Sequence, residues 1–333
     1  MRLCARCVLP DTFPGIQVDD EGVCNLCRET VSSERRRVQK TEYQERFEHL
    51  IRGRHSESGY DVLLCYSGGK DSTFTLAVLK KRYGLRVLAL TMDNGFMSSG
   101  SMANIRAVVG RLGIDHLLFA PRFDVLASIF RECARRNIYP AKTLERASAI
   151  CTSCMSIVRF SALQLAIEKR IPLIAYGWSP GQAPITSSIL KNNPHMVKLM
   201  QRSTFGPLHG IAGDAIRPYF LSDEHFNAAE RFPYNVHPLA FLEYDENEIY
   251  REIGGLGWSP VEDTDANSTN CLLNSFAIHV HRKQYGFHPY AFELAGLVRE
   301  GCLERSEAVA RLTQEPSAEI ISMVQSKLGL APG

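Results

Sequence analysis

The sequence has little net charge, which bears on the partners that the chain can bind. Its 38 basic and 36 acidic side chains leave a formal net charge of +2 at pH 7 over 333 residues. Proteins that bind nucleic acid usually carry a basic excess, because phosphate neutralisation supplies much of their affinity. The one candidate basic stripe, residues 35–40, has the pattern of a solvated helix face. We therefore expect the chain to act on a small molecule or a sugar in preference to tRNA.

Long apolar runs are also missing. No segment approaches the roughly 20 consecutive apolar residues of a membrane-spanning helix, and residues 1–7 lack the apolar stretch of a secretory signal. Hydrophobic residues make up 45% of the chain and charged residues 22%, which is typical of globular proteins. We expect a cytoplasmic protein with no membrane partner, and we expect it to form a homodimer.

Cysteine, by contrast, is plentiful. The chain has ten cysteines, and seven of them fall into two groups that are described below. A reducing compartment disfavours structural disulfides, so grouped cysteines indicate metal or redox chemistry. The other three, Cys65, Cys133 and Cys302, stand in apolar settings and are expected to be small core residues.

Short apolar runs alternate with segments of helical periodicity from residue 60 onwards. Strands are predicted at 60–66, 86–92, 115–119 and 172–176, and helices at 73–83, 99–112, 123–137 and 155–169. This alternation predicts an α/β fold with a parallel sheet and helices on both faces. Ligands bind beyond the carboxyl ends of the strands in such sheets.

Composition divides the chain further. We expect a four-cysteine unit at 1–30, a helical connector at 31–58, a nucleotide-binding domain at 59–285 and a helical region at 286–333 whose tail forms three short amphipathic helices. Residues 178–231 are rich in Pro, Gly, Asn and Ser. They predict a mobile or substrate-facing insertion, because long irregular loops are usually functional or disordered.

A glycine-rich turn joins the first predicted strand to the helix after it, with the sequence Ser67-Gly68-Gly69-Lys70-Asp71-Ser72. Backbone amides of such a turn can approach phosphates, and the helix N-terminus adds a partial positive charge. The two serine hydroxyls can donate to phosphate and Lys70 adds a charge, while Asp71 can hold Mg²⁺ on a polyphosphate. The spacing differs from that of the Walker loop.

These six residues resemble the SGGxDS motif of the PP-loop ATP pyrophosphatases, which cleave ATP between its α and β phosphates. The resemblance implies a PP-loop/HUP-like fold that binds ATP and Mg²⁺. It also implies that adenine lies near Asp93 at the end of the next strand, and that Gly177 forms a second nucleotide-contacting turn. The small and acidic residues usual after that glycine are replaced here by Trp-Ser-Pro-Gly at 178–181.

Two Cys-x-x-Cys pairs near the N-terminus have the spacing of a structural zinc site, formed by Cys4, Cys7, Cys24 and Cys27. A unit of about 30 residues has too few apolar groups to fold without such a metal. The segments 4–16 and 22–27 resemble the start of N-acetyl sugar amidotransferases, PP-loop enzymes that make an amidine on a bacterial surface sugar. That resemblance implies ammonia from a glutaminase partner, because this chain has no recognisable glutaminase domain.

A second group comprises Cys151, Cys154 and the distant Cys271. Three thiolates can hold a [4Fe–4S] cluster and leave one iron without a protein ligand. The pattern is similar to that of PP-loop tRNA thiolation enzymes. A redox or persulfide-carrying pair at Cys151 and Cys154, or buried spectator thiols, are the alternatives.

The leading hypothesis is adenylation of a substrate oxygen followed by sulfur transfer, in which a sulfur donor is a partner. Its predicted catalytic residues are Lys70, Asp71, Cys151, Cys154 and Cys271. The alternative is an amidotransferase in which ammonia displaces AMP. A third hypothesis is a nucleotide-sensing or scaffolding protein with two metal sites.

Overall fold

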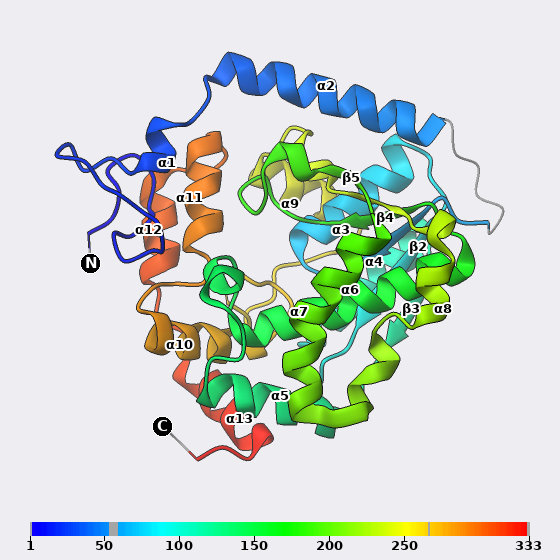
Figure 1. Ribbon diagram of the computed structural model, residues 1–333. Coiled ribbons are helices and arrows are strands. Elements are labelled where there is room, and N and C mark those ends of the chain that lie inside the picture. The colour runs from blue at the N-terminus through cyan, green and yellow to red at the C-terminus, as the bar shows by residue number, and fades with distance from the viewer. Residues whose placement is uncertain (1, 53–58, 266, 332–333) are drawn as a thin grey trace.

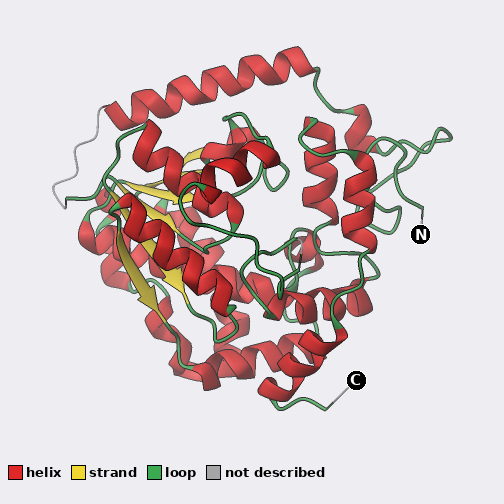
Figure 2. Ribbon diagram, turned by 180° about the vertical axis from the view of Figure 1, so that it is seen from behind, coloured by secondary structure: helices red, strands yellow, loops and turns green. Residues whose placement is uncertain are grey.

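The computed structural model describes residues 2–52, 59–265 and 267–331. Its sheet has the strand order β3-β2-β1-β4-β6-β5, and all neighbouring pairs are parallel except the antiparallel edge pair β5–β6. The strands are β1 Val62–Cys65, β2 Val87–Met92, β3 Asp115–Phe119, β4 Leu173–Tyr176, β5 Ile189–Lys191 and β6 Tyr234–Val236. Helices surround this sheet (Figure 2). The predicted α/β class is confirmed.

Alternation along β1 divides the core into two layers. Val62 and Leu64 face one layer and Leu63 faces the other, because successive side chains of a strand point to opposite faces. The first layer includes α3 (Lys70–Ala77), the π-helical turn η1 (Val78–Arg82) and α4 (Ser99–Leu112), and the second includes α5 (Phe123–Arg135) and α6 (Ala149–Lys169).

Helix α6 begins six residues earlier than predicted. The Ser148 hydroxyl caps it by accepting the N–H of Cys151, so both central cysteines lie in its first turns. Helix α6 is long and apolar enough to cross a membrane, but 56% of its apolar stretch is buried inside the protein, and it packs on the sheet as a core helix.

The terminal regions meet beside the sheet. The N-terminal unit, with α1 (Asn25–Arg28), lies next to the C-terminal helices α11 (Ala291–Glu300) and α12 (Arg305–Thr313), and α2 (Ser33–Arg52) extends from it along one side of the molecule (Figure 1). The rest of the predicted connector, 53–58, lies outside the described residues. With α13 (Ala318–Leu328), the three predicted tail helices are confirmed.

Residues 178–231 do not form the irregular loop that was predicted. They contain β5 and the helix α7 (Pro194–Ala212), because Asn193 accepts the N–H groups of His195 and Met196 and Pro194 occupies the first turn. The same proline and asparagine that suggested a loop therefore start a helix. The remaining helices are η2 (Ala141–Glu145), η3 (Ile185–Ser187), η4 (Gly213–Tyr219), α8 (Asp223–Asn227), η5 (Ala229–Arg231), η6 (Pro238–Ala240), α9 (Glu246–Gly254) and α10 (Leu273–Tyr285).

Candidate active site

The predicted phosphate loop lies at the carboxyl end of β1 and runs into α3. Gly68 has a φ of 80°, and a side chain there would place Cβ 2.6 Å from Cγ1 of Ile105. The Gly68 carbonyl accepts the indole N–H of Trp258 at 2.9 Å. The hydroxyls of Ser67 and Ser72 lie 3.0 Å apart across the turn. Glycine at position 68 is therefore a steric requirement of this turn.

Gly177 holds the end of β4 against this loop. A Cβ on Gly177 would lie 2.5 Å from Cα of Ser72 and 2.6 Å from its backbone nitrogen. Strands β1 and β4 are neighbours, but the chain leaves β1 toward β2 on the opposite side. The loop thus occupies the switch point at which parallel α/β sheets usually bind ligands.

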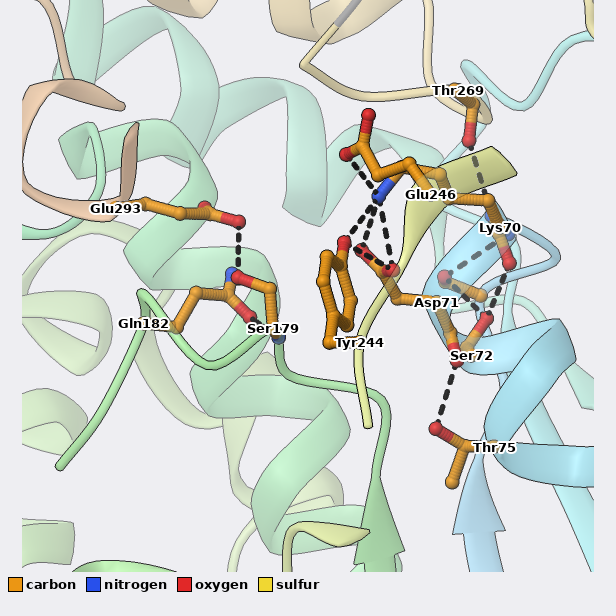
Figure 3. A network of polar contacts seen from close by, with 12 residues as sticks. Lys70, Asp71, Ser72, Thr75, Ser179, Gln182, Tyr244, Glu246, Thr269 and Glu293 are labelled. Carbon is orange, nitrogen blue, oxygen red and sulfur yellow. Dashed lines mark hydrogen bonds and ion pairs between the residues drawn. The ribbon is translucent and has the colours of Figure 1, made fainter. Parts of the chain in front are cut away.

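Lys70 is the centre of a buried charged cluster (Figure 3). Its Nζ lies 3.0 Å from Asp71 and from Glu246, and it donates to the Tyr244 hydroxyl at 2.7 Å. Arg311 forms a further ion pair with Glu246 at 2.5 Å. Burial opposes the charge on Lys70, but these oxygen partners raise its pKa well above the ordinary value. Lys70 therefore stays protonated.

The partners of Lys70 were missed by sequence reasoning. Tyr244, Glu246 and Arg311 belong to no motif and lie more than 170 residues along the chain from Lys70. Burial raises the pKa of Glu246, but the Arg311 hydrogen bond and the Lys70 charge outweigh it and lower that pKa to about 2.

Two of the three central cysteines contact Asn94. The Asn94 amide donates to the sulfur of Cys154 at 3.7 Å and to that of Cys271 at 3.4 Å. Cys151 stands one turn before Cys154 on α6, and Cys271 forms a β-bridge with Met97. Burial raises the pKa of Cys151 to about 11 and also raises those of Cys154 and Cys271. A bound metal centre would have to displace these protons.

One cavity of about 810 Å³ joins the loop to the cysteines. The predicted residues that line it are Ser67, Gly69, Lys70, Asp71, Ser72, Cys151, Cys154, Gly177 and Cys271. Gly68 and Asp93 are not among its lining residues. The Asp93 carboxylate accepts the N–H of Gly95 at 2.8 Å, and it is the neighbouring Asn94 that faces the cavity. Contact between Asp93 and adenine stays a prediction.

Helix α11 adds a carboxylate that the sequence did not reveal. Glu293 lines the cavity and accepts the Ser179 hydroxyl at 2.7 Å (Figure 3). The α11 backbone packs so closely on the loop after β4 that a Cβ on Gly181 would lie 2.2 Å from the Glu293 carbonyl oxygen. Burial raises the pKa of Glu293 to about 7. The only sequence signal at this position was the amphipathic pattern of the tail.

The four N-terminal cysteines form a separate buried cluster. Their sulfur atoms lie within 4.8 Å of one another, with 3.9 Å between Cys4 and Cys27 and 3.8 Å between Cys7 and Cys24. Four thiolates placed tetrahedrally at 2.3 Å from Zn²⁺ are separated by about 3.8 Å. The Arg305 guanidinium donates to the carbonyls of Cys4 and Cys7 at 3.0 and 2.9 Å. The donor set fits a closed metal site attached to α12.

Comparisons with known proteins give remote similarities. A scan against protein-family models finds no match. The uncharacterized protein MJ1599 of Methanocaldococcus jannaschii is 21% identical over 266 residues, which are 80% of this chain and 77% of that protein.

Two solved structures overlap the fold in part. The U34-tRNA thiolase NcsA of Methanococcus maripaludis, solved with its [4Fe–4S] cluster, is 16% identical at a TM-score of 0.38 and aligns over 97% of this chain and 96% of its own. NMN synthetase of Francisella tularensis is 11% identical at a TM-score of 0.38, over 88% and 97%. At this level of similarity, their activities remain properties of those proteins.

Proposed function

We propose that the chain is a PP-loop-type enzyme that adenylates an oxygen of an acceptor with ATP and then replaces that oxygen by sulfur. The observation that carries the proposal is the shared cavity, in which the phosphate loop and three cysteines face the same space. An intermediate formed at the loop would therefore lie within reach of chemistry at the cysteines without leaving the protein.

In the first half-reaction, the acceptor oxygen attacks the α phosphorus of ATP and pyrophosphate leaves. Loop amides and the N-terminus of α3 stabilise the phosphate charge. Asp71 would supply a carboxylate ligand for Mg²⁺, and Lys70, kept protonated by its partners, holds that carboxylate in place at 3.0 Å.

In the second half-reaction, sulfur attacks the activated carbon and AMP leaves with the former acceptor oxygen, so that C=O becomes C=S. Cys151, Cys154 and Cys271 fit a three-cysteine [4Fe–4S] site, because their thiols line one cavity and Asn94 donates to two of the sulfurs. Such a cluster, when bound, leaves one iron open to hydrosulfide. A separate sulfur donor and a small-molecule or sugar acceptor complete the proposal, and zinc is assigned to the N-terminal cluster.

A second candidate is an amidotransferase in which ammonia displaces AMP. The N-terminal segment that resembles N-acetyl sugar amidotransferases favours it, and its four cysteines do lie together. The first half-reaction is the same in both candidates, so only the nucleophile separates them.

Metal analysis distinguishes the two. We expect protein purified without air to be brown and to contain iron and acid-labile sulfide. The Cys271→Ser variant should lose both. The control variant Cys302→Ser should keep them, because Cys302 lies outside the cavity. Protein that is colourless and free of iron under these conditions contradicts sulfur transfer through a cluster. The amidotransferase candidate then predicts that Cys151→Ala leaves activity intact.

A further inference from the structure

A cation on α6 has no anionic partner among the described residues. Arg159 lines the cavity on the same helix as Cys151 and Cys154, and its Nε is buried without a hydrogen-bond partner. No ion pair is found for Arg159 within residues 2–52, 59–265 and 267–331. Arginine keeps its charge in a protein, and burying the Nε of this half-buried side chain without a hydrogen-bond partner is unfavourable. The charge of this side chain at the cavity wall is therefore available to an anion from outside the chain.

His237 lines the same cavity as Arg159 and feels the charge of its guanidinium. It is only 6% exposed and lines the cavity, and its Nδ1 has no hydrogen-bond partner within the described part of the chain. Its ring stacks on Trp178 at 4.4 Å and on Tyr176 at 5.2 Å between centroids. Burial, followed by the charge of Arg159, lowers the pKa of His237 to about 3. The imidazole is thus neutral, so Arg159 is the cationic member of this pair.

The position of Arg159 favours the acceptor over the ATP phosphates. Its charge acts on Cys65, Tyr176 and His237, on the α6 side of the sheet. The cation at the phosphate loop is Lys70, whose charged partners are Asp71 and Glu246. Lys70 begins α3 in the first core layer and Arg159 lies on α6 in the second, so the two cations enter the cavity from opposite faces of the sheet.

The distance along α6 sets the size of the ligand. Arg159 follows Cys151 by eight residues, which is about 12 Å at 1.5 Å per residue. Apolar side chains of Met155, Leu190 and Met200 also line the cavity. An organic acid held at Arg159 would extend along this wall toward the cysteines.

We propose that Arg159 and His237 form a subsite for a carboxylate or phosphate group of the acceptor, which orients its reactive oxygen toward the phosphate loop and the cysteines. The guanidinium fork matches either oxyanion with two parallel hydrogen bonds. The inference rests on the proposed function for the identity of the ligand as acceptor, but the subsite itself requires neither turnover nor a cluster.

Calorimetric titration tests the subsite with three probes of similar shape. Holoprotein saturated with α,β-methylene ATP, which occupies the phosphate loop, is titrated with benzoate, phenyl phosphate and uncharged benzamide. We expect at least one anion to bind about tenfold or more tightly than benzamide, as charge-assisted hydrogen bonds require. Whichever of the two anions binds more tightly identifies the acceptor group as a carboxylate or a phosphate.

Variants assign the effect to Arg159. Arg159→Met should abolish the preference for the anion and Arg159→Lys should reduce it, whereas Arg135→Met, an exposed arginine on α5, should retain it. Equal binding of anions and benzamide, no binding of any probe, or a preference that survives Arg159→Met overturns the proposal. So does weaker binding of α,β-methylene ATP by Arg159→Met, which would assign the guanidinium to ATP. If missing iron contradicts the sulfur-transfer proposal, the anion preference and its loss in Arg159→Met are still expected.

Discussion

A single methyl group at Gly177 should disable the phosphate loop. In Gly177→Ala the new Cβ would lie 2.5 Å from Cα of Ser72, about 0.9 Å short of the 3.4 Å at which ordinary van der Waals contact begins. The opposing atoms are backbone atoms of Asp71 and Ser72, so no side-chain rotation relieves the overlap. The loop or the end of β4 must move by about 1 Å, and misplacement of that size can cost about 100-fold in rate.

The assay compares this variant with the same substitution elsewhere. In α4, a Cβ added to Gly110 would meet no atom within 4 Å among the described residues, and replacement of this glycine by alanine should stabilise the helix by about 0.5–1 kcal/mol. We expect Gly177→Ala to bind α,β-methylene ATP at least about tenfold more weakly and to lose about 1–3 kcal/mol of stability through overpacking. Gly110→Ala should bind the nucleotide normally.

This reasoning is refuted if Gly177→Ala binds the nucleotide as tightly as the wild type and is also as stable to heat. That outcome would mean that the turn after β4 yields without disturbing Ser72. The loop would then be held by other contacts, such as the Trp258 hydrogen bond to Gly68.

Three further predictions concern ionisable groups. Cys24→Ser should weaken zinc binding more than about a hundredfold, since even residues that only hydrogen-bond to a metal ligand change metal affinity by about 10–100-fold. Measuring the zinc bound by this variant, with Cys302→Ser as the control, tests this. The pKa of Glu246 is lowered to about 2, so its ionised form stabilises the fold above its ordinary pKa of 4.5, and this contribution is lost as pH falls through 2. The Tm deficit of Glu246→Gln should therefore shrink with acidification, and a deficit that is constant with pH contradicts it. The pKa of Glu293 is raised to about 7, so its neutral form contributes stability below pH 4.5 that is lost as pH rises through 7. Glu293→Gln should then gain Tm relative to the wild type over this range, whereas the exposed Glu319→Gln should show no such trend.

Sequence reasoning succeeded where a feature depends on neighbouring residues. The apolar run at 60–66 is short and bounded by glycine, and it is the central strand β1. Residues 67–69 form the turn and 70–72 begin α3, and Gly68 adopts the positive φ that the turn needs. The paired N-terminal cysteines form one cluster, because two residues between thiols suit a knuckle. The domain limits stay predictions.

Local composition misled at 178–231. Proline and asparagine are common both in loops and at helix starts, and the difference depends on whether the following residues find a surface to pack on. Val197 and Leu208 of α7 are buried in the second core layer, and that packing decides the helix.

The sequence by itself determined the four parallel strands β1 to β4, the phosphate turn and the N-terminal cysteine pairs, because periodicity and close spacing express local geometry; the edge strands β5 and β6 were not predicted. Only the tertiary structure decided that Cys271 lies beside Cys154, that Glu246 fixes Lys70, and that Arg159 faces the cavity with no anion from the described residues. These relations join residues that are far apart along the chain or depend on how a helix rotates against the sheet. No local pattern encodes them, because they arise from the packing of elements whose mutual positions the whole fold sets.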